Sequence, residues 1–286
     1  ARTEIDDMGR KHSVIDDTSD TVDKPEAPAK LGHAFAISGA FDGATWYYGF
    51  DGGGTGDTQV NATFYPGGSA LVDAWPLSFA GINWIGVDGE LGIAAVPFKI
   101  SGGQQQITPS EFTSIQTRAS VALKARYTLK NGIGLGVRAG YRYYGASVEA
   151  QTISVNGATQ NLTVVPGYTL HAGALGAEVF LPVLIGNHRL ELELRADGLP
   201  ITYYDEKPDN PGATTLAFGW AVSLAGRYDI ASGFFAEVRA QSTGAQVTYT
   251  DKGSRLALVG QQLKQLQGGS VLNLTAGFSA GIGFMF

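Results

Sequence analysis

The last stretch of the chain, SVLNLTAGFSAGIGFMF (residues 270–286), alternates between apolar side chains and small or polar ones. Counting back in steps of two from Phe286 through Phe284 to Phe278 and beyond gives an unbroken apolar face. Over 273–285 the other face holds Gly, Ser, Thr and Asn, apart from Met285. A period of two is that of a β-strand. The chain therefore ends in a strand with one continuous apolar face and an aromatic last residue.

The same period recurs from residue 31 onward, with turns or polar stretches between the segments. Clear alternation runs through 117–129, 133–144, 188–197, 215–227 and 234–241, and weaker segments lie near 31–50, 66–79, 83–98 and 164–185. With the last strand, these segments predict ten antiparallel strands, and eight is the alternative count. Short turns near 80–82, 130–132, 185–187 and 229–232 alternate with longer polar stretches at 101–113, 149–163, 205–213 and 250–269.

Composition excludes several classes of protein. The chain has no Cys, which excludes a disulfide scaffold and thiol chemistry. Its net charge of −6, without a basic cluster, argues against nucleic-acid binding. No apolar run approaches the roughly 18 residues of a transmembrane helix. Charged residues make up only 16 % of the chain, and its 40 glycines fall inside the alternating segments, which disfavours helices.

Residues 1–30 differ from the rest of the chain. They are acidic, poor in large apolar residues and Pro-containing near their end. Such a segment buries too little apolar surface to offset the entropy of ordering it. We therefore expect two parts, a flexible acidic tail over 1–30 and a β-barrel over 31–286.

Alternation alone also suits a soluble β-sandwich or a lipocalin-like barrel. Three features favour a membrane barrel. The apolar faces run eight to twelve residues with almost no polar break, as lipid requires. Aromatic residues gather toward strand ends, as in interfacial girdles: Tyr127, Tyr228, Phe284 and Phe286 at one end, and Tyr141, Tyr143, Tyr168 and Tyr203 at the other. Short turns also alternate with long loops.

On these residues the chain resembles bacterial outer-membrane β-barrels. The most specific element is the last strand, because alternating apolar residues and a terminal aromatic are the signature that the barrel-assembly machinery of that family reads. The matching positions are Phe278, Ile282, Phe284 and Phe286. The Gly-rich strands are also similar to those of small barrels of gliding and predatory proteobacteria. The resemblance implies an outer-membrane location with a periplasmic tail, and closure of the barrel by the last strand against the first.

If the apolar faces look outward, the inward faces carry charges of both signs. The expected lumen network comprises Asp88, Glu90, Arg118, Lys124, Arg126, Arg138, Arg142, Arg189, Glu191, Glu193, Arg195, Asp197, Arg227, Glu237 and Arg239, and we expect Asp73 to join it. A ten-stranded bore is little wider than one that side chains just fill. A filled, ion-paired lumen is the first interpretation, and a narrow ion pore or a ligand-binding bore are the alternatives.

Two local features need separate interpretation. Within TDKGSRLALVGQQLKQLQGG (250–269) the residues Leu256, Val259, Leu263 and Leu266 follow a helical spacing. They either fold over the barrel mouth or form a contact surface for another protein. The alternation also breaks between Leu170 and Glu178, which predicts a β-bulge near 173–176.

We expect no enzyme, cofactor or metal. Ten strands also suit the omptin family of outer-membrane proteases, which need an Asp/His constellation at the loop end. The four histidines are predicted in the tail (His12), at a strand start (His33), in a strand (His171) and in a tight turn (His188). None of them falls in a long loop, and the residues of the omptin motif are absent.

The expected function is therefore that of a structural or scaffolding subunit in a cell-envelope assembly. Its expected partners are outer-membrane lipid, the barrel-assembly machinery and other envelope proteins, with no nucleic acid. A narrow outer-membrane channel and a surface adhesin are the alternatives.

Overall fold

The computed structural model describes residues 2–5, 11–14, 34–52, 58–99, 107–108, 111–155, 158–161, 164–186, 188–209, 211–231, 233–259 and 262–286. The chain divides into two compact units, Ala1–Gly32 and His33–Phe286. Within the first unit, β1 (Arg2–Ile5) pairs with β2 (Lys11–Val14) as an antiparallel ladder. His33 lies outside the described residues.

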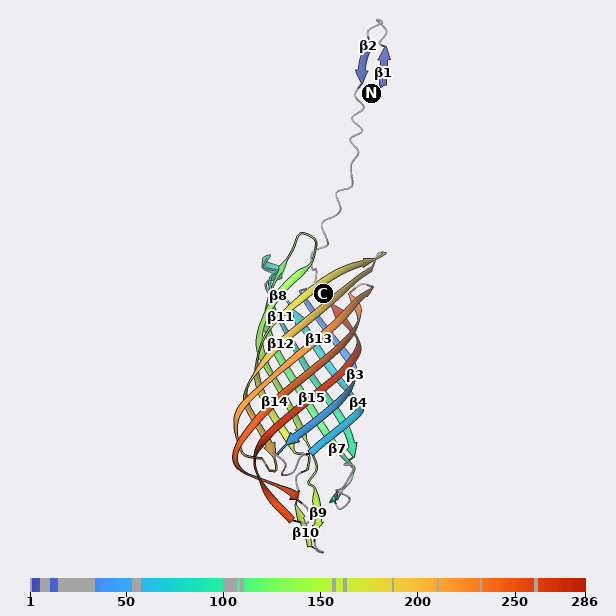
Figure 1. The fold of residues 1–286 in the computed structure, drawn as a ribbon. Helices are drawn as coiled ribbons and strands as arrows, with labels where there is room; N and C mark the ends of the chain where they lie inside the picture. Colours follow the sequence, from blue (N-terminus) through green and yellow to red (C-terminus); the bar gives the residue numbers. More distant parts are fainter. Residues whose placement is uncertain are drawn as a thin grey trace. The chain divides into compact units, whose positions relative to one another are not determined.

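The second unit is a closed barrel of ten antiparallel strands (Figure 1). The strands are β3 (Phe35–Asp51), β4 (Thr58–Ala74), β5 (Ile85–Lys99), β7 (Glu111–Thr128), β8 (Gly134–Ser147), β11 (Gly167–Ile185), β12 (His188–Lys207), β13 (Ala213–Ala231), β14 (Phe234–Val259) and β15 (Gln262–Met285). Each strand pairs with its neighbours in chain order, and the predicted count of ten is confirmed. No helix in the described part of the chain has the length and hydropathy to cross a membrane.

The barrel closes between its first and last strands. β15 pairs antiparallel with β3 from Ser270↔Asp51 to Met285↔Ala36. At the end of this ladder the N–H groups of Ala34 and Phe35 both donate to the carbonyl oxygen of Phe286. The expected closure of the last strand against the first is confirmed.

The barrel wall reverses the polarity of a soluble protein. Its outer face is apolar and its inner face is charged or polar. Phe278 on the outside of β15 is 52 % exposed, whereas its neighbour Ser279 is 5 % exposed inside the barrel. Large apolar side chains such as Leu91, Leu123 and Val238 likewise stand on the outer surface. Buried charged residues face the lumen instead. This inversion is the arrangement of a barrel in lipid.

One end of the barrel carries tight turns and the other carries long connections. We call them the turn end and the loop end. The C-terminus lies at the turn end (Figure 1). There β4 joins β5 through the 3₁₀ turn η1 (Ser78–Ala80), so β4 stops at Ala74 instead of the predicted 79. Trp75 N–H donates to Ala34 O at 2.7 Å, and Pro76 cannot extend the ladder.

At the loop end the connections form structure of their own. β6 (Ile107–Thr108), β9 (Thr152–Val155) and β10 (Ala158–Asn161) make a small sheet in the order β10-β9-β6. The β14–β15 hairpin also projects from this end (Figure 1). About 9–11 residues suffice to span a membrane. β14 has 26 residues and β15 has 24, so both strands extend well beyond the lipid.

Toward the loop end the barrel wall splits along two seams. β4 pairs with β5 only up to Gly67↔Ala94, and β12 pairs with β13 only up to Pro200↔Phe218. Beyond these pairs, five strands (β13, β14, β15, β3, β4) form one sheet and the other five (β5, β7, β8, β11, β12) form a second. We call them the β15-centred and β8-centred sheets.

Each seam has a proline at the position where pairing stops. Pro66 directly precedes Gly67 on β4, Pro97 lies on the facing edge of β5, and Pro200 is in the last β12–β13 pair. Proline has no N–H and is tolerated only where a strand needs no donor. These prolines explain why the two edges of each seam do not pair further.

The helical interpretation of residues 250–269 is wrong. β14 and β15 continue their ladder through this segment, with Leu256↔Gln265 and Val259↔Gln262 as late pairs and register shifts on either side of Lys252. Leu266 is 1 % exposed, so it is not on a surface open to a partner. Leu256 packs against the core, while the side chains of Val259 and Leu263 lie outside the described residues.

The bulge predicted near 173–176 is also wrong. β11 pairs with β8 without a shift, and its shift against β12 lies between His171 and Ala172. The extra residue is Thr202 on β12. The prediction assumed that Leu170 faces lipid, but Leu170 is 3 % exposed and faces the lumen.

Candidate functional site: a closed lumen in two layers

The lumen toward the turn end is filled by charged side chains, which we call the ion-pair layer. Several of its ion pairs join strands on opposite sides of the barrel. Asp73 on β4 lies 3.8 Å from Arg227 on β13, and Asp88 on β5 lies 3.8 Å from Arg195 on β12. Each of these strand pairs is four steps apart around the wall. The pairs therefore cross the bore instead of lining it.

All fifteen charged residues predicted for the lumen face it, and Asp73 does too. The structure adds two acidic residues that the sequence interpretation missed, Asp42 and Glu178. The layer holds nine basic side chains, Arg118, Lys124, Arg126, Arg138, Arg142, Arg189, Arg195, Arg227 and Arg239. It also holds nine acidic ones, Asp42, Asp73, Asp88, Glu90, Glu178, Glu191, Glu193, Asp197 and Glu237.

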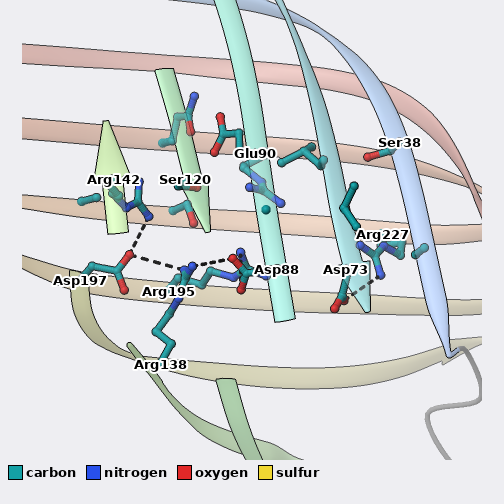
Figure 2. Close-up of a pocket in the computed structure, with 18 of the residues that line it drawn as sticks. Ser38, Asp73, Asp88, Glu90, Ser120, Arg138, Arg142, Arg195, Asp197 and Arg227 are labelled. Atoms are coloured by element: carbon teal, nitrogen blue, oxygen red, sulfur yellow. Dashed lines mark hydrogen bonds and ion pairs between the residues drawn. The ribbon is translucent and has the colours of Figure 1, made fainter. Parts of the chain in front are cut away.

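Asp88 and Asp197 are the centres of this layer (Figure 2). Arg138 reaches both carboxylates, at 2.8 Å from Asp88 and 3.5 Å from Asp197. Arg142 donates to Asp197 at 2.6 Å. The Asp197 side chain is only 1 % exposed, so these contacts replace water around its charge. Buried charges require such partners.

The space left among these side chains is small. The cavity lined by Asp73, Asp88, Arg138, Asp197 and Arg227, among others, has a volume of about 30 Å³. A cavity of that size has room for only a few water molecules. With equal numbers of opposite charges and so little free space, the ion-pair layer closes the bore.

The lumen toward the loop end is apolar, and we call this part the aromatic layer. Phe98 packs against Trp46 with ring centroids 5.8 Å apart and against Phe112 at 5.4 Å. Tyr168 stacks on Tyr204 at 5.9 Å. These residues come from both half-barrels, so the layer is the core of a two-sheet sandwich. Tyr168, predicted for an outer girdle, is thus an inward residue.

The connection after β8 folds into the mouth of the barrel. Val164 and Val165 are 4 % and 1 % exposed within the aromatic layer. Gln151 accepts from both of their N–H groups, at 2.9 and 3.1 Å, and donates to Val165 O at 2.7 Å. The segment therefore brings its own polar partners and acts as a plug.

One buried polar cluster joins the two sheets on the loop-end side of the aromatic layer. Arg255 on β14 donates to Glu206 on β12 at 3.1 Å. Arg255 also donates to Tyr48 Oη at 2.8 Å and to Val164 O at 2.7 Å, and Tyr48 donates to Glu206 at 3.0 Å. The side chains of Arg255 and Glu206 are 2 % and 0 % exposed. We call this cluster the clasp, because its bonds join the β15-centred sheet to the β8-centred sheet.

A second small cavity separates the two layers. It has a volume of about 50 Å³ and is lined by Asp42, Glu90, Arg118 and Tyr65, among others. Arg118 binds both acids, at 2.6 Å to Asp42 and 2.5 Å to Glu90. Tyr65 donates to Gln116 at 3.2 Å from the aromatic side. Like the cavity within the ion-pair layer, it is enclosed by side chains that have hydrogen-bond or ion-pair partners.

His171 and His188 do not face the acidic residues of the lumen. His171 stands on the outer wall, where it is hydrogen-bonded to Tyr141 Oη. His188 Nδ1 lies 3.1 Å from Asp229 O at the turn end. Among the described residues, no group of three or more His, Asp or Glu side chains is placed to hold a metal ion.

The residues missed from the sequence have two explanations, one for Glu178 and one for Arg255 and Glu206. Glu178 shares the inward face of β11 with Leu170, Ala172 and Ala174. An inward face that changes from apolar to charged along one strand breaks the rule that apolar means outward. Arg255 and Glu206 were missed because 250–269 and 205–213 were interpreted as loops.

Comparisons with known proteins report a likeness of architecture. No protein-family model and no curated protein matches the chain. Among solved structures, it is similar to the outer membrane protease OmpT of Escherichia coli, with a TM-score of 0.48, 10 % identity and coverage of 88 % of this chain and 96 % of that one. It is also similar to the β domain of the Bordetella autotransporter BrkA, with a TM-score of 0.39, 12 % identity and coverage of 87 % and 100 %.

A third similar structure is the outer membrane protein OprG of Pseudomonas aeruginosa, with a TM-score of 0.33, 10 % identity and coverage of 88 % and 95 %. The geometry of the chain itself carries more weight than these distant likenesses. Ten strands close into a ring, the outer face is apolar and the inner face is charged. The chain is a ten-stranded antiparallel β-barrel of the membrane-spanning kind.

Proposed function

We propose that this barrel is a non-enzymatic structural subunit of a cell-envelope assembly. The observation that carries the proposal is the closed lumen. Ion pairs cross the bore, and the cavity among them has a volume of only about 30 Å³. A bore of this kind has no path for solutes. Its wall and its projections are what remain for function.

The projections at the loop end are the contact surfaces in this proposal. The two half-barrel sheets, the β14–β15 hairpin and the small β10-β9-β6 sheet stand beyond the lipid-facing wall. Outer-membrane barrels expose their longer loops outside the cell and their short turns to the periplasm. Phe35 begins β3 beside Phe286 at the turn end, which supports a periplasmic tail in this proposal. Residues 1–30 would then contact other envelope proteins.

Purification from native outer membranes in mild detergent, followed by mass analysis, tests the proposal. A stoichiometric protein partner is the expected result. A barrel that elutes alone, from membranes in which cross-linking also captures nothing, would contradict it.

The contact surface can be located by shortening the hairpin. Joining Leu256 to Gln265 through Asn-Gly removes the tip and retains Arg255 and Leu266, which belong to the core. The matched control shortens the β9–β10 hairpin (Thr152–Asn161) in the same way. Loss of the partner in one variant alone would identify the surface, whereas retention in both would contradict a loop-end contact.

A further inference from the structure

A histidine lies among three tyrosines on the outer wall of the barrel. The ring of His171 on β11 is 5.3 Å from Tyr143 and 6.0 Å from Tyr141 on β8, and 5.4 Å from Tyr203 on β12. Tyr141 Oη is hydrogen-bonded to His171 Nδ1. An ordinary interfacial girdle presents tyrosine hydroxyls to the headgroups. Here one hydroxyl is committed to fixing the imidazole, so the cluster has a defined geometry.

A groove begins directly beside this cluster and runs across β7, β8, β11 and β12. It has a volume of about 870 Å³, and its lining includes Tyr143, Thr117, Thr169, Asp205 and Lys207. Gly145 and Gly167 also line it, where any other residue would add a side chain to the wall. The start of the β8–β11 connection, including Val148, borders the groove. Its size is that of a site for a small ligand.

The groove combines one cation with acceptors and hydroxyl groups. Lys207 has a side chain 71 % exposed, with its ammonium 4.0 Å from Asp205. Tyr203 lies two residues before Asp205 on β12, on the same outward face. Thr117 and Thr169 add hydroxyls on the facing strands. A mobile ammonium suits a phosphate, while carboxylate and hydroxyl groups suit the hydroxyls of a sugar.

The position of the groove along the barrel axis determines which part of the membrane it meets. Toward the turn end, the same outward faces carry Leu175, Val137 and Leu194, which are 63 %, 64 % and 50 % exposed. Toward the loop end, the outward residues are polar, for example Thr113 and Ser147. The groove thus lies at the boundary between acyl chains and headgroups on the loop side of the membrane.

We propose that this groove binds the phosphorylated sugar headgroup of an outer-leaflet glycolipid. The acyl chains lie along the apolar wall below, the sugar packs against Tyr143 and the His171 cluster, and the phosphate meets Lys207. The proposal rests on the outer-membrane assignment and is independent of the closed lumen and of any protein partner.

The chain supplies a matched control on the opposite sheet. A Cβ added at Gly145 would lie 2.6 Å from Tyr143 Oη, and one added at Gly49 would lie 2.5 Å from Tyr47 Oη. Both tyrosines therefore cover a glycine two residues away on the outer wall. Tyr47 does not line the groove. Lys252 is likewise an exposed lysine of the loop end outside the groove.

The test is native mass spectrometry of the purified barrel titrated with lipid A in detergent micelles, with phosphatidylglycerol as the second probe. We expect one tightly bound lipid A, at least fivefold weaker binding in Tyr143→Ala and Lys207→Met, and unchanged binding in Tyr47→Ala and Lys252→Met. Heat-modified electrophoretic mobility confirms folding. Because Lys207 is exposed, its variant remains informative if Tyr143→Ala does not fold.

Three outcomes would overturn the proposal. Equal loss in groove and control variants would mean general adsorption at the interface. Equal affinity for phosphatidylglycerol would mean that the sugar is not recognised. Unchanged lipid A binding in folded Lys207→Met and Tyr143→Ala, with loss of a co-purified protein instead, would assign the groove to a protein.

Discussion

The two halves of the lumen are built on different physical principles. In the ion-pair layer the wall is a continuous ladder, and charged side chains of both signs fill the bore. In the aromatic layer the wall is two sheets separated by seams, and apolar rings fill the space. A hydrogen-bonded ring holds itself closed, so its interior needs only to be packed and neutral. Two separate sheets need a core that holds them together.

The clasp is the exception within the apolar half. Arg255 and Glu206 are deeply buried there. The bonds of Glu206 with Arg255 and with Tyr48 join the two sheets, and the bond of Arg255 to Val164 O fixes the plug. A buried ion pair adds little net stability compared with apolar packing. Its directional bonds do define how the sheets face each other, and we take that as its role.

The largest effect expected from the difference between the two layers follows removal of a charge from the ion-pair layer. Asp197→Ala leaves Arg138 and Arg142 without their shared carboxylate and should cost about 3–5 kcal/mol. Asp197→Asn should cost nearly as much, because charge matters more than shape there. Urea unfolding in detergent micelles measures both. Lys207→Ala, with its exposed surface pair, is the control and should cost less than about 1 kcal/mol. A mild effect of Asn would contradict the account.

In the aromatic layer, side-chain volume should matter instead of charge. Phe98→Ala removes a ring that contacts Trp46 and Phe112 and should cost about 3–5 kcal/mol. Phe98→Leu should recover more than half of the loss, since volume decides there. The same unfolding assay compares the two variants. If Leu were as damaging as Ala, the layer would not be a packed core.

A third test compares the two faces of one strand. Phe278→Arg puts a charge on the lipid face and should cost about 2–4 kcal/mol if it lies near the bilayer midplane. Ser279→Thr, on the lumen face, should be close to silent. Refolding yield into lipid vesicles reports both. Equal yields would show that the inside and outside of β15 are assigned the wrong way round.

The smallest expected effect concerns the clasp. Glu206→Gln keeps the shape but removes the charge that accepts from Arg255 and Tyr48, and should cost about 1.5–3 kcal/mol. The loss should be local, so limited proteolysis should cut the plug segment 148–166 faster while the turn end stays protected. Faster cleavage at both ends would mean that the clasp stabilises the barrel as a whole.

The sequence predicted the turn-end half of the barrel much better than the loop-end half. Where one wall face meets lipid and the other meets charges, a period of two assigns every residue, and the charged positions from Asp88 to Arg239 were all placed correctly. Beyond the membrane, an apolar residue such as Leu170 or Leu266 can face inward. Alternation then no longer distinguishes the two faces.

Long-range pairing caused the remaining errors. The spacing of Leu256 and Leu266 suits a helix, but the β14–β15 ladder continues through them and overrides local preference. The clasp joins residues on different strands, with Tyr48 158 positions from Glu206 along the chain. No local pattern marks such a pair. The seams were visible only as prolines within strands, a signal that could have been used.

Conductance in planar bilayers tests the central claim, a closed lumen, most directly. The wild-type barrel, reconstituted in molar potassium chloride, should give no resolved current steps, because ion pairs cross the bore and the cavity among them has a volume of only about 30 Å³. A folded variant carrying Arg138→Ala and Asp197→Ala together, which removes two central side chains of the ion-pair layer and keeps the charge balanced, should conduct more. Stable steps from the wild-type protein would contradict the account and make the barrel a channel.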